Sequence, residues 1–524
     1  LGDVYKRQSI FASNIGSEHL IGLAGAGASS GMAMAHWEIQ GWMILILGWV
    51  FVPFYTRSMV YTMPEFLERR YNPQSRTILS VISLVSYVLT KVAVTVYAGG
   101  LVFQQVFGIK ELWGIDFFWI AAIGLVVLTA LYTIFGGMKS VLYTSVLQTP
   151  ILLLGSLIIL VLGFKELGGW DEMMRVCGAV TVNDYGDTMT NLIRSNDDAN
   201  FPWLGALIGS AIIGFWYWCT DQFIVQRVLS GKNEMEARRG TIFGAYLKLL
   251  PVFLFLIPGM IAFALHQKYI GAGGEGFLPM LENGTANADA AFPTLVAKLL
   301  PAGVKGLVVC GILAALMSSL ASLFNSSAML FTIDFYKRFR PQTSEKKLVG
   351  IGQVATVVIV ILGILWIPIM RSVGDVLYTY LQDVQSVLAP GIAAAFLLGI
   401  CWKRTSAQGG MWGLISGMVI GLTRLGAKVY YSNAGEVADS TFKYLFYDMN
   451  WLFFCGWMFL FCIIVVIVVS LATEAPTAEK IQGLVFGTAT KEQKASTRAS
   501  WNHWDIIHTV IILAITGAFY WYFW

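Results

Sequence analysis

Apolar runs of roughly 20 residues recur along this chain, and they constrain its fold more than any other feature. A helix of that length spans the hydrocarbon core of a bilayer, where every backbone polar group must be satisfied within the protein. We place thirteen such segments at approximately 9–31, 32–56, 77–109, 114–135, 140–164, 203–225, 240–266, 301–335, 348–370, 375–402, 406–427, 446–473 and 503–524. The sequence therefore predicts an all-α, polytopic membrane protein.

Composition supports this prediction and excludes other classes. Only 13% of the residues are charged, against about 25% in soluble domains. The net charge is +4, and without a basic cluster we expect membrane lipid, and not nucleic acid, as a partner. Six cysteines occur without a CxxC pattern, so we expect no metal site or disulfide framework. No nucleophile–base pair, HExxH motif or phosphate loop is visible, so we do not expect an enzyme.

The positive residues indicate which loops face the cytoplasm. Pairs such as Arg69-Arg70, Lys337-Arg338 and Lys403-Arg404 follow alternate segments, which is typical of inner loops. The long loops 165–202 and 267–300 and the C-terminus are then outside. We expect a multi-pass protein of the plasma membrane, which in a bacterium is the inner membrane. The polar leader 1–8 begins with Leu1, so we expect a non-native start and a missing upstream helix.

Two interruptions in the apolar sequence indicate an ion site. The first is the polar run 12–19, and the second is the pair Ser318-Ser319 in an aliphatic segment. Backbone that leaves the helical form at membrane depth is tolerated where it lines a cavity or holds an ion. Carbonyl and hydroxyl oxygens are ligands that sodium accepts. These features predict an ion-coupled transporter.

Strongly polar residues inside the segments are candidates for function, because they are costly in a membrane. They are Asn14, Glu18, His19, Glu38, Lys91, Asp221, Gln222, Lys248, Gln382 and Gln385. Each has a structural alternative. Lys91 could snorkel or pair with a carboxylate, and Asp221-Gln222 could stabilise a helix break or take part in gating.

Several short motifs resemble, in the same order, those of the sodium/glucose cotransporter family of sodium/solute symporters. They are Phe11 to His19 (FASNIGSEH), Trp216 to Gln222 (WYWCTDQ), Tyr246 to Leu249 (YLKL), Met317 to Ser326 (MSSLASLFNS), Tyr380 to Gln382 (YLQ) and Phe396 to Arg404 (FLLGICWKR). Each motif alone is modest evidence, but the shared order over residues 9–524 makes chance negligible.

The resemblance implies a LeuT-like core of two inverted five-helix repeats with peripheral C-terminal helices. We expect the first repeat at 9–165 with an incomplete first helix, and an extracellular loop at 166–202. The second repeat then occupies 203–404, and peripheral helices 405–524. Five segments per half also fit an inverted repeat, because an odd number inserts the two halves with opposite orientation.

The resemblance also implies which residues bind sodium. Ala12 and Ile15 would offer backbone carbonyls from the unwound first helix. Ala315 would add a carbonyl, and Ser318 and Ser319 would add hydroxyls, from the eighth. From periodicity alone, a Ser-Ser pair is as well explained by bonding to the preceding turn or by helix packing.

The same resemblance implies a site for a neutral sugar. Its expected residues are Asn14, His19, Glu38, Trp218, Lys248 and Gln382, with Tyr217 as inner gate and Trp37 and Leu23 as outer lid. Glu38 can accept two hydroxyl protons and Lys248 can donate. His19 could instead be a satisfied interhelical histidine.

Departures from the family pattern affect stoichiometry and specificity. The family often has Asp where this chain has Ser145, and members that move two sodium ions carry Thr at the position of Ala321. We therefore expect one sodium per sugar. Gly214 and Gln385 stand where the family has Thr or Ser, so the preferred sugar can differ from glucose.

Two alternatives to sodium/sugar symport remain open. The solute could be another polyol such as myo-inositol, a sugar acid or an amino acid. The single Lys248 beside Glu38 argues for a neutral solute over an anionic one. A sugar sensor that does not transport is the other alternative, but we see no attached signalling domain.

Overall fold

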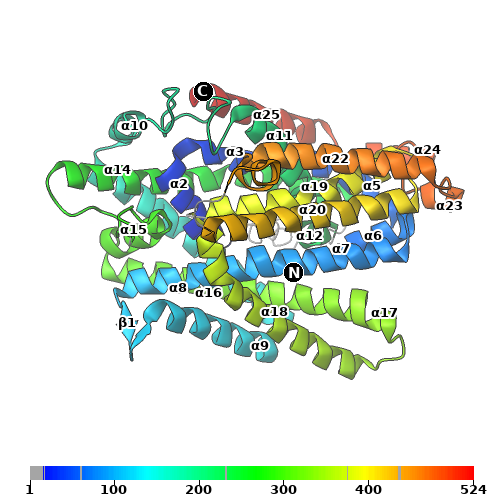
Figure 1. The fold of residues 1–524 in the computed structure, drawn as a ribbon, viewed down its shortest axis with the longest axis horizontal. Coiled ribbons are helices and arrows are strands. Elements are labelled where there is room, and N and C mark those ends of the chain that lie inside the picture. The colour runs from blue at the N-terminus through cyan, green and yellow to red at the C-terminus, as the bar shows by residue number, and fades with distance from the viewer. Residues whose placement is uncertain are drawn as a thin grey trace.

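The computed structural model describes residues 16, 18–59, 62–229, 233–281, 283–373, 376–434 and 438–524. The described chain is a bundle of long helices that run along one direction, with short elements at both ends (Figure 1). Ten helical stretches of this part are long and apolar enough to cross a membrane. The prediction of a polytopic helical membrane protein is confirmed.

The first half of the bundle contains helices interrupted by π-helical turns. Its elements are η1 (Glu18–Leu23), α2 (Ala24–Ser30), η2 (Gly31–Met34), α3 (Ala35–Glu38), α4 (Gly41–Ile46), η3 (Leu47–Phe51), α5 (Val52–Ser58), α6 (Met63–Arg70), α7 (Pro73–Ser86), η4 (Tyr87–Val92), α8 (Ala93–Phe107), β1 (Glu111–Leu112), β2 (Ile115–Asp116), α9 (Phe117–Leu167) and α10 (Trp170–Gly178). The two strands form an antiparallel hairpin in which Glu111 pairs with Asp116.

The second half continues the pattern and ends in the peripheral helices. Its elements are α11 (Trp203–Gly214), η5 (Phe215–Thr220), α12 (Gln222–Leu229), α13 (Glu234–Leu247), η6 (Val252–Leu256), α14 (Ile257–Gly271), η7 (Ala288–Ala290), α15 (Ala291–Leu299), α16 (Ala302–Met329), η8 (Leu330–Tyr336), α17 (Lys337–Phe339), α18 (Glu345–Val373) and α19 (Leu377–Cys401). They are followed by α20 (Ala407–Asn433), α21 (Thr441–Lys443), η9 (Tyr444–Asp448), α22 (Trp451–Ala472), α23 (Ala478–Ile481), α24 (Lys491–Ala499) and α25 (His503–Tyr522).

The spans differ from the thirteen expected segments in three places. The first two segments form one stretch, Glu18–Ser58, that is helical except for a short break after Glu38. Phe117–Leu131 is apolar but shorter than the other spans, and α20 is absent from the ten because its glycine-rich sequence is less hydrophobic. The boundary expected near 136–139 is not marked by a helix end, since α9 is helical throughout.

Local sequence signals explain where many helices begin. Asn72 accepts from the backbone N–H of Ser75 at 2.8 Å and caps α7, with Pro73 as its first residue. Asn502 and Asp505 form a reciprocal capping box at the start of α25. Both arrangements satisfy N–H groups that a helix leaves unpaired in its first turn. The short helix α6 begins in the same way, with Thr62 accepting from the backbone N–H of Glu65.

Burial ranks the helices from the centre to the edge of the bundle. In α19, 83% of the most apolar window is buried, whereas in α25 the share is 17%. Helix α19 therefore runs through the core, and α25 packs at the periphery, as expected for the last helix.

Elements that we expect outside and inside lie at opposite ends of the bundle. Figure 1 shows α10, α14, α15 and β1 gathered at one end, and α6, α17, α23 and α24 at the other. The end with α17 carries the Lys337-Arg338 pair. This separation agrees with the sidedness that the positive residues predict.

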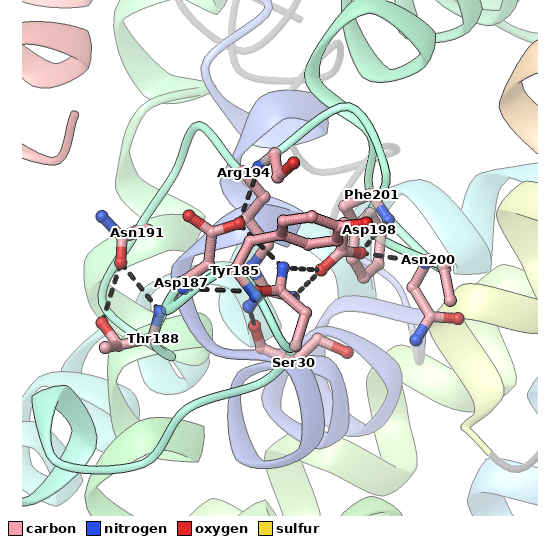
Figure 2. Close-up of polar contacts among 12 residues, drawn as sticks. Ser30, Tyr185, Asp187, Thr188, Asn191, Arg194, Asp198, Asn200 and Phe201 are labelled. Carbon is pink, nitrogen blue, oxygen red and sulfur yellow. Dashed lines mark hydrogen bonds and ion pairs between the residues drawn. The ribbon is translucent and has the colours of Figure 1, made fainter.

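The loop after α10 is fastened to the C-terminal end of α2 (Figure 2). The Arg194 guanidinium donates to the carbonyl of Ser30 and lies 3.8 Å from Asp198. Asp198 in turn accepts from the backbone N–H groups of Asn200 and Phe201. A cation is favourable at a helix C-terminus, where carbonyls are unpaired. The acidic residues of this loop therefore stabilise the folded form of the loop itself.

Gly31 allows this loop to approach the helix. Its φ is 65° and its ψ is −141°, a conformation essentially restricted to glycine. A Cβ at this position would lie 2.0 Å from the carbonyl oxygen of Met189. That carbonyl accepts from the backbone N–H of Met32 at 2.8 Å, so the close approach is part of the docking.

We expect Gly31→Ala to destabilise the protein more than Gly108→Ala. Gly108 also has a positive φ, 66°, but an added Cβ there would meet open space. It should cost only the left-handed backbone penalty of about 1–2 kcal/mol. Thermal unfolding in detergent measures both variants, and Gly31→Ala should show the larger drop in melting temperature. Equal drops would contradict the proposed docking of the loop.

Candidate functional site

A small cavity at the centre of the bundle brings together most of the expected site residues. Its volume is about 50 Å³, which holds a few water molecules, so a larger solute requires the wall to move. Six of the expected residues line it, namely His19, Trp37, Tyr217, Trp218, Lys248 and Gln382. They come from distant parts of the sequence, which supports the expected convergence on one site.

A buried ion pair stands behind the wall of this cavity. Lys248 Nζ donates to Glu38 Oε2 at 2.7 Å, and the Tyr378 hydroxyl donates to Glu38 Oε1 at 2.5 Å. Glu38 is fully buried, and Lys248 is 4% exposed. Glu38 is thus not part of the cavity wall itself, as a direct sugar ligand would be, and it reaches the cavity through Lys248 and Tyr378.

His19 and Trp218 complete the surroundings of the ion pair. His19 Nε2 lies 3.5 Å from Glu38 Oε2, and its ring meets that of Tyr378 edge-on at 6.1 Å. Lys248 Nζ lies 5.6 Å from the centre of the Trp218 ring, within range of a cation–π attraction. The aromatic face expected to stack on a sugar is therefore next to the ammonium group.

Several polar atoms in the cavity wall have no hydrogen-bond partner within the described part of the chain. They are His19 Nδ1, Trp37 Nε1 and Gln382 Oε1, whereas His19 Nε2 faces Glu38. Buried polar groups are nearly always satisfied in folded proteins. Three unpaired atoms on residues that line one cavity indicate a place where a polar ligand completes the hydrogen bonding.

Irregular helices form three sides of the cavity. The segments η1, η4 and η5 are π-helical and contribute His19, Lys91 and Tyr217, respectively. Single π-helical turns inside α-helices are rare and occur frequently at functional sites. The irregularity that the sequence predicts in the first and sixth segments is therefore concentrated at the site.

The chain leaves the helical form at Asp221, between η5 and α12, where φ is −76° and ψ is 128°. Asp221 Oδ2 lies 3.7 Å from Lys91 Nζ. Gln222 Oε1 accepts from the backbone N–H of Met63 at 2.6 Å and links the break to α6. The expected break is confirmed. The contacts fit both of the roles considered for Asp221-Gln222.

Gly214 and Gln385 both line the cavity, at positions where the chain departs from the family pattern. A Cβ on Gly214 would lie 2.5 Å from Gln40 Oε1. Gln40 Nε2 donates to the carbonyl of Ser210 at 2.8 Å, so the amide is held where a larger residue at 214 would stand. The missing side chain is therefore replaced by the amide of Gln40, from the break between α3 and α4.

The expected outer lid has one residue at the cavity and one away from it. Trp37 lines the cavity and stacks on Trp451, with ring centres 5.4 Å apart. Leu23 is fully buried in η1 and does not contact the cavity. Of the two expected lid residues, only Trp37 thus lines the cavity.

The expected sodium ligands fall in two regions, and one of them is described. Ala315, Ser318 and Ser319 lie in the continuous helix α16, with both serines half-buried. Ala12, Asn14 and Ile15 lie outside the described residues, as does the side chain of Ser145. Ala321 is fully buried and offers no hydroxyl.

Sequence reasoning did not single out three polar residues of the cavity wall, Gln40, Thr90 and Tyr378. Tyr378 precedes Gln382 by four residues, so both lie on one face of α19. That spacing was a usable signal. Gln40 follows two residues after Glu38 in a short break, where a helical period does not apply.

Comparisons with known proteins identify the family and the fold of this chain. A model of the sodium:solute symporter family matches residues 1–417. Human sodium/myo-inositol cotransporter 2 is 37% identical over 493 residues, which cover 92% of this chain and 72% of the relative. Sodium/glucose cotransporter 1 of Ovis aries is 39% identical over 495 residues, covering 89% and 72%.

A solved structure of a Na⁺-coupled sialic acid symporter has a similar fold. Its TM-score is 0.64 at 20% identity, with 91% of each chain covered. At this identity the likeness concerns the fold alone, and it confirms the expected LeuT-like architecture. From the family match and the two cotransporter relatives, this chain belongs to the sodium:solute symporter family, as a multi-pass plasma-membrane protein that couples solute symport to sodium.

Proposed function

We propose that this symporter moves a neutral, polyhydroxylated solute, a hexose or an inositol, together with one sodium ion by alternating access. The observation that carries the proposal is the set of unpaired donors and acceptors around the cavity. Trp37 Nε1 can only donate, Gln382 Oε1 can only accept, and neutral His19 does both. A hydroxyl group also does both, so a ring that carries several hydroxyls can satisfy all of these atoms.

The charges around the cavity support a neutral solute. Lys248 is paired with Glu38, and Lys91 with Asp221. Glu18, which also lines the cavity, adds a further carboxylate. An anionic solute would need a surplus of cationic groups, and the paired lysines do not provide one.

The names of the relatives support a polyol as the class of solute, but they do not distinguish between a sugar and an inositol. One has the name of a myo-inositol cotransporter and another that of a glucose cotransporter, at 37% and 39% identity. Glucose, galactose and myo-inositol share a six-membered ring with several hydroxyls. Gly214 and Gln385 differ from the family pattern at the wall, and Gln40 occupies the space beside Gly214, so we assign discrimination between these rings to that side of the cavity.

Sodium would bind between the first and eighth segments of the chain. In the proposed set, Ser318 and Ser319 supply hydroxyls and Ala315 a carbonyl from α16, while Ala12 and Ile15 supply carbonyls. Neutral oxygens can replace the hydration shell of an alkali ion. The serines fit this role as residues that are only half-buried within α16.

In this mechanism sodium favours the outward-open form, and the solute then completes the closed form. Tyr217 at the cavity serves as the inner gate, with the break at Asp221 beside it. One charge moving through 100 mV contributes about 2.3 kcal/mol, and together with the concentration ratio one ion supplies about 3 kcal/mol. Since 1.4 kcal/mol corresponds to a tenfold ratio, one sodium per solute supports roughly hundredfold accumulation.

Uptake into proteoliposomes tests the proposed coupling and substrate class. Labelled glucose, galactose, myo-inositol and a sugar acid are offered with inward sodium or potassium gradients at equal membrane potential. We expect sodium-dependent uptake of at least one neutral polyol, little uptake of the acid, and one positive charge per solute in current recordings. Equal uptake with sodium and potassium would refute the coupling.

Ser318→Ala should raise the sodium concentration needed for half-maximal uptake, with a smaller effect on the solute. The change removes one proposed ligand from α16. Ser326→Ala is the matched control, because its hydroxyl bonds to the carbonyl of Ser322 in the same helix at 3.0 Å. A sodium dependence that is identical in both variants would remove Ser318 from the proposed site.

Tyr378→Phe should raise the KM for the solute roughly tenfold. A hydrogen bond to a charged group contributes about 1.5–3 kcal/mol, and the lost hydroxyl holds Glu38 beside Lys248. Tyr380→Phe is the control, since that hydroxyl donates to the carbonyl of Leu89 at 3.0 Å, away from the cavity. If the two variants have the same KM, Tyr378 does not belong to the solute site.

A further inference from the structure

A buried carboxylate outside the solute site joins a loop to the helices that carry that site. Asp289 lies in η7, in the segment between α14 and α16, and is 4% exposed. Helix α15 follows directly, and Figure 1 shows α15 at the same end of the bundle as α10. The positive residues assign that end to the outside.

Asp289 caps the first turn of α19. Both of its carboxylate oxygens lie 3.1 Å from the backbone nitrogen of Leu377, the first residue of that helix. A side chain that accepts from a first-turn N–H stabilises a helix start, and a negative charge there is favoured by the helix dipole. The next residue is Tyr378, which holds Glu38, so the cap lies one residue from the solute site.

The same carboxylate contacts two further helices of the site. The hydroxyl of Tyr97 on α8 donates to Asp289 Oδ2 at 3.4 Å. A Cβ on Gly25 of α2 would lie 2.5 Å from Asp289 Oδ1, so the carboxylate sits directly on this helix. The Asp289 side chain thus contacts α2, α8 and α19. Helix α2 follows η1, which contains His19, and α8 follows η4, which contains Lys91, while α19 itself contains Gln382.

The charged and titratable groups around Asp289 come from several elements. Arg371 of α18 packs over the rings of Phe118 and Tyr97, at 4.3 and 5.1 Å, and supplies a nearby positive charge. Lys298 of α15 donates to the carbonyl of Phe277. The groups in the adjoining helices are Tyr97, Tyr378, Tyr380, Asp383, Glu18 and His19.

We propose that Asp289 is the latch of an outer lid, the segment 288–299 formed by η7 and α15, and that its contact with the start of α19 holds the cavity closed toward the outside. In this role Asp289 is a positioning residue that does not touch the solute. The inference rests on the proposed function, because an outer lid has meaning only in alternating access.

Protonation links the latch to pH. Burial raises the pKa of Asp289 to about 7, even though the Leu377 N–H, Tyr97 and Arg371 all favour the carboxylate form. An open lid would expose the group to water, where its pKa is about 4. The closed form therefore binds more protons between these values. Closing is favoured as pH falls below 7, and raising the pH toward 7 favours opening by up to about tenfold per pH unit.

The rate of cysteine labelling from outside tests the latch. Val94→Cys places a thiol in the cavity wall, one turn from Tyr97 on α8. The full chain in proteoliposomes is treated with a membrane-impermeant thiol reagent at pH 6 and pH 8. The labelling rate of the protein without this cysteine is subtracted from each measured rate. The result is divided by the labelling rate of the same variant in its unfolded state at that pH, which removes the intrinsic pH dependence of the thiol.

Two substitutions at Asp289 distinguish the effect of its hydrogen bond to Leu377 from the effect of its negative charge. Asp289→Ala loses the cap, and we expect labelling at least several-fold faster than in the parent at pH 6. Asp289→Asn keeps an acceptor for Leu377 N–H but cannot ionise, so its labelling should be slow at both pH values. The parent should label faster at pH 8 than at pH 6. Glu275→Gln, an exposed acid of the same loop, should match the parent.

The outcomes distinguish the latch from the transport proposal. Labelling of Asp289→Ala at the parent rate at both pH values would overturn the latch, as would a pH response retained in Asp289→Asn. Thermal unfolding of each variant shows whether faster labelling reflects a general loss of structure, and a Tyr380→Phe variant of matched stability serves as reference. If the labelling results are as expected but solute uptake does not depend on sodium, the latch and alternating access stand, and the proposed sodium coupling is refuted.

Discussion

The ion pair between Glu38 and Lys248 is the interaction on which the central site depends. Two charges at membrane depth are costly, and removing one partner of such a pair leaves an uncompensated charge worth about 3–5 kcal/mol. Tyr378 adds a hydrogen bond to the second carboxylate oxygen. The pair therefore fixes the relative positions of α3, α13 and α19, and the cavity forms where these elements meet.

The cavity also departs from ordinary packing. Three π-helical segments surround it, and polar atoms of His19, Trp37 and Gln382 remain unpaired there. Such features lower the stability of a protein, and they persist where function requires them. With only about 50 Å³ of free space, the solute must separate groups that contact one another in its absence. Binding and conformational change are thus one process in this account.

Much of the fold and site was predictable, because both depend on patterns that the sequence displays. Apolar runs of bilayer length gave the helices, and strongly polar residues inside those runs, such as Glu38, Lys248 and Gln382, marked the cavity. The break after Thr220 was visible as the polar pair Asp221-Gln222. The roles of these residues came from resemblance to a family, since polarity alone leaves structural alternatives open.

Other features depend on contacts between distant segments, which local patterns do not report. Glu38 was expected to bind the solute, yet it is fully buried behind Lys248 and Tyr378. The space left by Gly214 is filled by Gln40, from a helix break more than 150 residues away in the sequence. Asp289 lies in a loop and caps the distant helix α19, and the sequence of neither segment predicts this contact. From its sequence, the acidic loop near Asp198 resembles a charged surface, but its carboxylates accept hydrogen bonds from the backbone of the same loop.

A high-resolution cryo-EM map of the protein with saturating sodium chloride and a transported polyol is the most direct test of this account. The account predicts density for a six-membered ring within hydrogen-bonding distance of His19, Trp37 and Gln382, with Lys248 beside it. Ring density elsewhere in the bundle, with this cavity unchanged and filled only by water, would contradict it.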